Sequence, residues 1–186
     1  MTFKAAEIDL PFIGGFTPLD QRSQSAALTT KILLENSGLA AFDRGHLPGH
    51  MTASAFVVSH DQSHVLLMHH RKLNRWLQPG GHCDGETDFK AVALKELSEE
   101  TGLTDVHLIS DPPCDVDVHT IPARGDMPAH DHYDVRFLFA ADMKSPLLPN
   151  SEAIDVRWIP LRELDQYTNA PSVLIVRALA SPASSG

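Results

Sequence analysis

The spacing of apolar residues near the start of the chain predicts one helix that precedes the main run of strands. Over residues 19–37, Leu28, Ile32 and Leu33 recur at helical spacing, and Gly38 stands where such a helix should end. This helix could cover the core, form a dimer contact or act as a lid. We favour packing against the core.

Farther along, short apolar or alternating segments between Pro, Gly and Asp turns predict strands. Strands are expected at residues 53–59, 64–70, 106–110, 115–121, 133–140 and 153–159. Strand-free segments are expected at residues 1–18, 42–51 and 71–76, and later helices at residues 160–164 and 172–180. Strands mixed with a few helices predict an α+β fold or an α/β/α sandwich.

A further helix, between Gly81 and Gly102, is predicted to carry a dense cluster of carboxylates. Glu96, Glu99 and Glu100 are spaced i, i+3 and i+4, which places them on one helix face. The opposite, apolar face carries Ala93, Leu94 and Leu97. Like charges at this spacing repel unless a cation joins them, so a hard divalent cation is one interpretation. A solvated helix face is the other.

The residues that flank this helix have the types expected at helix ends. Thr87 or Asp88 can cap its N-terminus, and Gly102 can end it in the left-handed conformation. Lys95 lies one turn before Glu99 and can hold that carboxylate in place. The sequence Pro79-Gly80-Gly81 before the helix predicts a sharp turn where the backbone can approach a ligand.

Length and charge limit the classes of protein to which the chain can belong. Its 186 residues suit one domain with an extension, and 42% hydrophobic and 21% charged residues are ordinary for a soluble protein. A net charge of −9 argues against broad nucleic-acid or membrane binding. The two cysteines do not form a disulfide framework, and Cys83 is interpreted as a bystander. No signal peptide or spanning segment is evident, so we expect a cytoplasmic protein.

The carboxylate helix and its flanks resemble the Nudix box, in which glycine, glutamate, arginine and apolar positions recur at set intervals. The matching residues are Gly81, Glu96, Leu97, Glu99, Glu100, Gly102 and Leu103. Two positions depart from the box. Thr87 replaces a glutamate, although Glu86 is adjacent, and Lys95 replaces an arginine, which keeps the charge but loses the planar fork.

The resemblance implies a Nudix fold, an α/β/α sandwich with a mixed sheet, over residues 46–180. Residues 1–45 would then be an extension, and residues 181–186 a disordered tail. It also implies a Mg²⁺- or Mn²⁺-dependent hydrolase that cleaves a phosphoanhydride bond in a nucleoside diphosphate linked to another group. Glu96, Glu99 and Glu100 would be catalytic and bind the metal, together with the Gly81 backbone. A homodimer is a further possibility, because Nudix proteins often pair.

Substrate contacts are expected outside the helix. The segment before the box carries Arg71, Lys72 and Arg75, which could hold phosphate oxygens or simply form an exposed basic loop. Asp134 is a further candidate for substrate binding. The general base varies among Nudix enzymes, so the candidates are Glu100, Glu152 and the group over residues 130–134.

Histidines near the box raise the possibility of a transition metal. In an extended strand His130, His132 and Asp134 point the same way, which suits a metal, a phosphate or a solvated polar face. His82 directly follows the double glycine. This Gly-Gly-His variant is similar to Nudix hydrolases with unassigned substrates and to the related isopentenyl diphosphate isomerases, in which histidines join glutamates in binding metal.

Two alternatives to hydrolysis therefore remain open. An isomerase-like enzyme would bind a transition metal tightly and release no phosphate, as His82, Cys83 and His130/His132 suggest. A ligand-sensing Nudix domain without turnover would fit the departures at Thr87 and Lys95.

Overall fold

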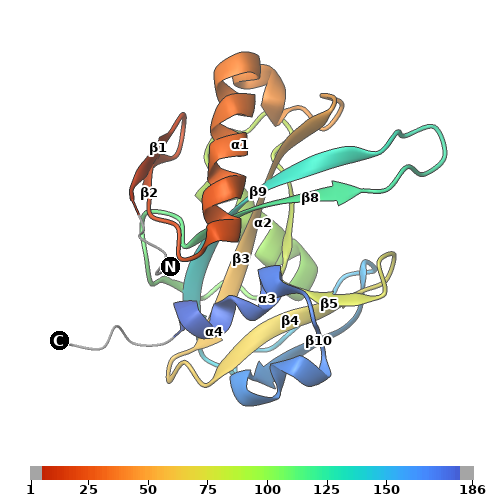
Figure 1. Ribbon diagram of the computed structural model, residues 1–186. Helices are drawn as coiled ribbons and strands as arrows, with labels where there is room; N and C mark the ends of the chain where they lie inside the picture. The colour runs from red at the N-terminus through yellow and green to blue at the C-terminus, as the bar shows by residue number, and fades with distance from the viewer. Residues whose placement is uncertain (1–5, 181–186) are drawn as a thin grey trace. The chain divides into compact units, whose positions relative to one another are not determined.

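The computed structural model describes residues 6–180 and combines strands with helices (Figure 1). The predicted tail at 181–186 lies outside the described residues, as does the start of the predicted extension. The helical elements are α1 (Gln21–Ser37), η1 (Gly38–Phe42), α2 (Phe89–Thr101), η2 (Leu161–Gln166), α3 (Pro171–Leu174) and α4 (Val176–Leu179). The strands are β1 (Ile8–Leu10), β2 (Gly14–Phe16), β3 (Gly49–Ser59), β4 (His64–His70), β5 (Arg75–Leu77), β6 (Gly80–His82), β7 (His107–Leu108), β8 (Asp115–Ile121), β9 (His130–Ala141) and β10 (Ala153–Pro160).

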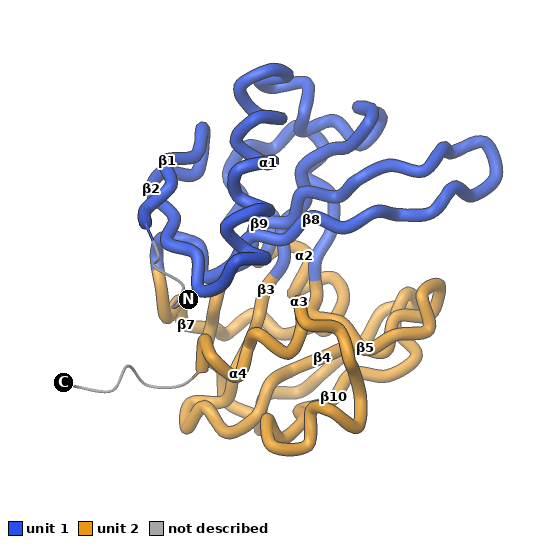
Figure 2. The backbone as a smooth tube through the Cα atoms, viewed as in Figure 1, with its two compact units in different colours: residues 1–54, 80–93, 111–137 blue, residues 55–79, 94–110, 138–186 orange. Residues whose placement is uncertain are grey.

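The chain divides into two compact units, each assembled from three stretches of sequence (Figure 2). Unit 1 comprises residues 1–54, 80–93 and 111–137, and unit 2 comprises residues 55–79, 94–110 and 138–186. Strand β3, helix α2 and strand β9 each begin in unit 1 and end in unit 2.

Eight strands form one sheet with the order β10-β4-β3-β9-β7, and β5, β6 and β8 pair with β4, β3 and β9. In unit 1, β6 pairs with the first half of β3 and β8 pairs with the first half of β9, both antiparallel. In unit 2, β4 pairs antiparallel with β3 and β10. All of β3 and the middle of β4 are buried, and their apolar runs, residues 55–58 and 65–68, lie in the core of unit 2.

The N-terminal helix is confirmed, and it covers part of the core of unit 1. It begins after Asp20, whose side chain accepts a hydrogen bond from the Ser23 N–H at 2.7 Å in a capping box. Ala26 and Ala27 pack with Leu10, Phe16 and Val116 in one hydrophobic cluster. The face with Leu28 and Ile32, which predicted the helix, is exposed.

Several predicted segments differ from the observed ones because strand pairing overrides local sequence. The irregular start contains the hairpin of β1 and β2, and the expected loop over 42–51 begins at the last residue of η1 and ends within β3. The Gly80-Gly81 turn is instead strand β6, and the basic segment ends in strand β5. The strand expected over 106–110 is reduced to β7, and the last helix is split into α3 and α4.

Predictions with a strong pattern of alternating residues hold more closely. Strands β4 and β8 have the predicted bounds, and β9 begins three residues earlier than expected. On β9 the predicted apolar face is buried at Val135, Phe137 and Phe139. On α2, Ala93 and Leu97 are buried as expected, but Leu94 is 36% exposed.

None of the helices described over residues 6–180 is long and apolar enough to cross a membrane.

Candidate functional site

The second half of α2 presents the predicted carboxylates in unit 2. The Glu96 side chain is 16% exposed and the Glu99 side chain 55%, whereas Glu100 is 5% exposed. The three therefore range from buried to open along one helix, and each offers two oxygen atoms. Oxygen donors of this kind suit Mg²⁺ or Mn²⁺.

Lys95 connects two of these carboxylates. Its Nζ donates to Glu96 Oε1 at 3.2 Å and to Glu99 Oε2 at 3.3 Å. These contacts, with the Glu96 hydrogen bond first, raise the pKa of Lys95 above its usual range. The predicted contact between Lys95 and Glu99 is confirmed, and it partly offsets the repulsion among the glutamates.

Both ends of α2 use the predicted residues. Asp88 Oδ1 accepts hydrogen bonds from the Lys90 and Ala91 N–H groups, both at 3.0 Å, and so acts as the cap. At the other end Gly102 has a φ of +74° and donates its N–H to the Ser98 carbonyl at 2.9 Å. The capping chemistry therefore sets the limits of the helix on which the carboxylates lie.

The predicted phosphate-binding residues lie in unit 2 at the end of β4 and on β5. Arg71 donates from its side chain to the Ser151 carbonyl at 2.9 Å and to the Ala153 carbonyl at 3.1 Å. Lys72 Nζ lies 3.8 Å from the Glu152 carboxylate. Arg75 opens β5 and is exposed. Arg71 thus holds a neighbouring loop, and the phosphate role of all three residues stays a prediction.

The histidines gather in unit 1. His50 on β3, His82 on β6 and His130 and His132 on β9 bring their rings together, with centroids 4.8 Å apart for His50–His132 and 5.0 Å apart for His50–His130 and His82–His132. His119 on β8 lies against His132 at 5.5 Å. The sequence-predicted pair on β9 is therefore part of a larger cluster.

Burial favours the neutral form of three of these histidines, His50, His82 and His132. It is the largest cause that lowers the pKa of His82 to about 4 and of His132 to about 2. Neighbouring imidazoles lower both pKa values further, and Arg44 also lowers that of His82. Burial likewise lowers the pKa of His50. At neutral pH the rings of His50, His82 and His132 therefore each have a nitrogen lone pair available.

Asp134, predicted to bind substrate, is buried and hydrogen-bonded within unit 1. It is 4% exposed, and its carboxylate accepts hydrogen bonds from Thr52 at 3.1 Å, from Ser54 at 2.8 Å and from Arg136 Nε at 2.7 Å. Those contacts assign it a structural part in unit 1. Its role in substrate binding stays a prediction without a contact that favours it.

The sequence analysis did not single out His50. This residue lies in a segment expected to be a loop, about 80 positions before its ring partners on β9, His130 and His132. Gly49 could have indicated a close approach between two strands. A Cβ there would lie 2.5 Å from the Asp131 carbonyl oxygen, so only glycine allows β3 to approach β9 this closely. The His50–His130 contact depends on that approach.

Residues 48–177 match the NUDIX domain family, a stretch well over half the chain. The chain therefore belongs to the NUDIX domain family, and the resemblance found in the box around α2 is confirmed.

The chain is also similar to individual proteins, at low sequence identity. Phosphatase NudJ of Escherichia coli K12 is 30% identical over 107 residues, which cover 56% of this chain and 63% of NudJ. The chain thus spans less than two thirds of the curated relatives that it matches.

Two solved structures show the same fold. The C. elegans Ap4A hydrolase, in a binary complex, aligns with a TM-score of 0.56 and 17% identity over 70% of this chain and 94% of that one. The E. coli dihydroneopterin triphosphate pyrophosphohydrolase aligns with a TM-score of 0.56 and 13% identity over 68% of this chain and 90% of that one. The predicted α+β Nudix fold is thereby confirmed.

Proposed function

We propose that this protein is a Mg²⁺- or Mn²⁺-dependent Nudix hydrolase that cleaves a phosphoanhydride bond in a nucleoside diphosphate linked to another group. The carboxylate face of α2 carries the proposal. Three glutamates crowd one helix at box spacing, and one lysine holds two of them. The names of the related proteins, a phosphatase, an Ap4A hydrolase and a triphosphate pyrophosphohydrolase, support phosphoanhydride chemistry.

The donor set fits a hard divalent cation. Glu96, Glu99 and Glu100 offer oxygen ligands only, and the Lys95 ammonium lies between Glu96 and Glu99. When bound, Mg²⁺ would neutralise charge on the diphosphate and lower the pKa of an attacking water.

The chain's own residues would position the substrate and move the proton. Lys95 would keep Glu96 and Glu99 oriented. The basic residues before the box would contact phosphate oxygens, with Lys72 the better placed because Arg71 donates to backbone carbonyls. Glu100 and Glu152 remain candidates for the base, as does the group over residues 130–134.

The test is a Glu99→Gln variant, assayed by phosphate-coupled turnover. The substrates would be dinucleoside polyphosphates, nucleoside triphosphates, nucleotide sugars and ADP-ribose, each with Mg²⁺, Mn²⁺ or EDTA. We expect metal-dependent turnover in the wild type and a loss of about 100-fold or more in the variant. Because the Glu99 side chain is half exposed, its unfolding free energy should change by no more than about 0.5 kcal/mol.

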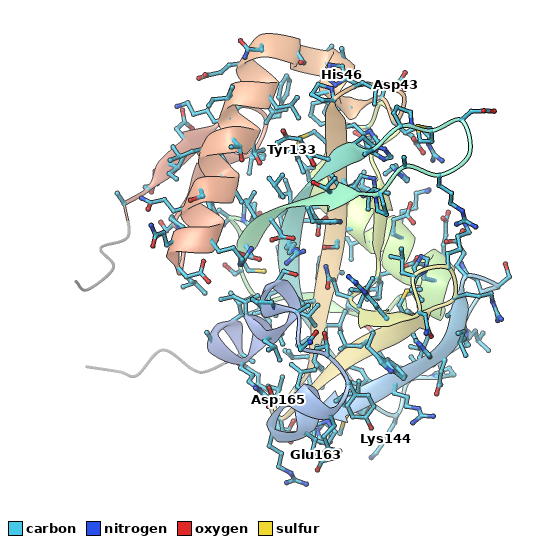
Figure 3. All side chains as sticks on the ribbon, turned by 45° about the vertical axis from the view of Figure 1, so that its right-hand side comes forward. Asp43, His46, Tyr133, Lys144, Glu163 and Asp165 are labelled. Atoms are coloured by element: carbon cyan, nitrogen blue, oxygen red, sulfur yellow. The ribbon has the colours of Figure 1, made fainter. Side chains whose placement is uncertain are left out.

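Glu163→Gln is the matched control, since it removes one charge from η2 in the same unit (Figure 3). Wild-type turnover in Glu99→Gln would refute the metal assignment. Thermal stabilisation by a substrate without product would favour the sensing domain. Rearrangement of a diphosphate without phosphate release would favour the isomerase-like enzyme. The histidine cluster could bind the transition metal of such an enzyme.

A further inference from the structure

Three histidines of unit 1 are arranged around one point. The ligand-competent atoms of His50, His130 and His132 all lie within 4.8 Å of one another. They come from β3 and β9, strands that Gly49 allows to approach closely. His50 is 1% exposed and His130 is 7% exposed, so this arrangement is held by packing rather than by chance at the surface.

The backbone around the cluster orients two of the rings. His130 Nδ1 lies 2.9 Å from the Pro128 carbonyl, and His50 Nδ1 lies 3.4 Å from the His46 carbonyl. A carbonyl oxygen only accepts, so Nδ1 carries the proton in each ring and Nε2 presents a lone pair. Metal-ligating histidines are commonly oriented by such a contact to the second nitrogen.

His46 itself is fixed by the turn before β3. Its N–H donates to the Asp43 carbonyl at 2.9 Å, and Figure 3 shows the two residues side by side. Its Nδ1 contacts the Gly49 carbonyl at 2.6 Å. The turn therefore presets the backbone carbonyl toward which the His50 ring is turned.

Two further ring nitrogens of the cluster are buried without a protein partner among the described residues. His50 Nε2 and His132 Nε2 are buried and have no hydrogen-bond partner among residues 6–180. An unsatisfied buried nitrogen costs about 1–3 kcal/mol, so two in one cluster call for a ligand between them. His82 lies against both rings, at 5.1 Å from His50 and 5.0 Å from His132.

We propose that His50, His130 and His132 form a binding site for a divalent transition metal such as Zn²⁺, Co²⁺ or Ni²⁺, with ligands other than the carboxylates of α2. Imidazole nitrogens favour these metals, whereas Mg²⁺ prefers oxygen. A four-coordinate metal with Zn–N bonds of about 2.0–2.1 Å needs nitrogens about 3.3 Å apart, so small ring rotations would complete the site. Three protein ligands leave one position for water, for His82 or for an exogenous ligand.

Metal binding by the histidines does not depend on catalysis by the carboxylates. It can be tested by titrating the whole chain with Co²⁺ after bound metal has been removed with a chelator. We expect one Co²⁺ per chain with the intense visible absorption of four- or five-coordinate cobalt, and displacement by Zn²⁺ but not by an excess of Mg²⁺. The Glu99→Gln variant should retain this spectrum, which separates the site from the proposed hydrolytic centre.

The diagnostic variant is His132→Phe, which keeps an aromatic ring in the cluster and removes the ligand atom. Because loss of an outer-shell partner alone weakens metal binding by 10–100-fold, we expect at least about 100-fold weaker Co²⁺ binding. The control is His107→Phe, which replaces an exposed histidine of β7 whose ring lies 5.8 Å from that of His60. Equal binding by His132→Phe and the wild type would overturn the assignment.

A second measurement covers the case in which His132→Phe does not fold. Crystals of the wild type grown with Zn²⁺ should show one anomalous difference peak between the Nε2 atoms of the three histidines. Anomalous density only beside the α2 carboxylates, or none, would overturn the proposal.

Discussion

Arg136 is 2% exposed and lies among three carboxylates in unit 1. It contacts Asp134 at 2.7 Å, Asp117 at 3.0 Å and Asp115 at 3.1 Å. Arg22 adds a second guanidinium, at 2.7 Å from Asp117 and 2.8 Å from Asp115. The two guanidinium groups thus balance most of the charge of the three carboxylates, which are shielded from water. Removal of one charge would leave its buried partners unpaired.

We therefore expect Arg136→Met to destabilise the protein by about 3–5 kcal/mol, because it leaves buried carboxylates without their main partner. Urea unfolding followed by circular dichroism measures this change. Arg162→Met is the control, since the Arg162 side chain is 83% exposed and should change the unfolding free energy by no more than about 0.5 kcal/mol. An unchanged urea midpoint for Arg136→Met would show that the buried network does not stabilise the fold.

At the scale of elements, α2 depends on how it ends. Gly102 takes the left-handed conformation, and a Cβ at this position would lie 2.8 Å from the Leu148 Cβ. The Leu148 N–H also donates to the Thr101 carbonyl at 2.7 Å, which ties the end of the helix to that loop. Position 102 therefore favours glycine for two reasons, the left-handed backbone conformation and the lack of space for a side chain.

Gly102→Ala should cost more than the roughly 1–2 kcal/mol expected for a left-handed alanine alone, because the clash with Leu148 adds to it. Gly125→Ala is the comparison. Gly125 has a φ of +58°, and a Cβ there would meet nothing within 4 Å. The two urea midpoints distinguish the contributions, and equal losses would mean that the Leu148 loop moves aside without cost.

At the scale of the whole molecule, the buried charges couple unfolding to acid. Burial alone would raise the pKa of Asp117, but the His119 hydrogen bond and the charges of Arg136 and Arg22 outweigh it and hold the pKa well below its usual range. A carboxyl group with a lowered folded pKa contributes stability that is present above its unfolded pKa of about 4 and is lost as the pH falls further.

Asp117→Asn should therefore flatten the loss of stability between about pH 5 and pH 2. The change in slope can reach about 1.4 kcal/mol per pH unit, the value for one proton. Unfolding free energies from urea titrations at successive pH values measure it, with Asp126→Asn, in an exposed loop, as control. Parallel pH profiles for wild type and Asp117→Asn would contradict the lowered pKa.

Much of α2 and its surroundings was predictable because short-range rules govern it. Glu96, Glu99 and Glu100 share a face by helical spacing, and Asp88 and Gly102 end the helix by chemistry within a few residues. The match to the box then led to the family. Strand β6 was missed, since Gly80 and Gly81 have turn-forming composition and become a strand only by pairing with β3.

The local periods, the helix limits and the carboxylate face were thus readable from residue order, because each depends on neighbours within one or two turns. The histidine cluster and the buried ionic network required the folded chain. His50 meets His130 across 80 positions, and Arg22 meets Asp115 across 93. Strand register and the close approach at Gly49 decide such contacts, and neither leaves a local pattern in the sequence.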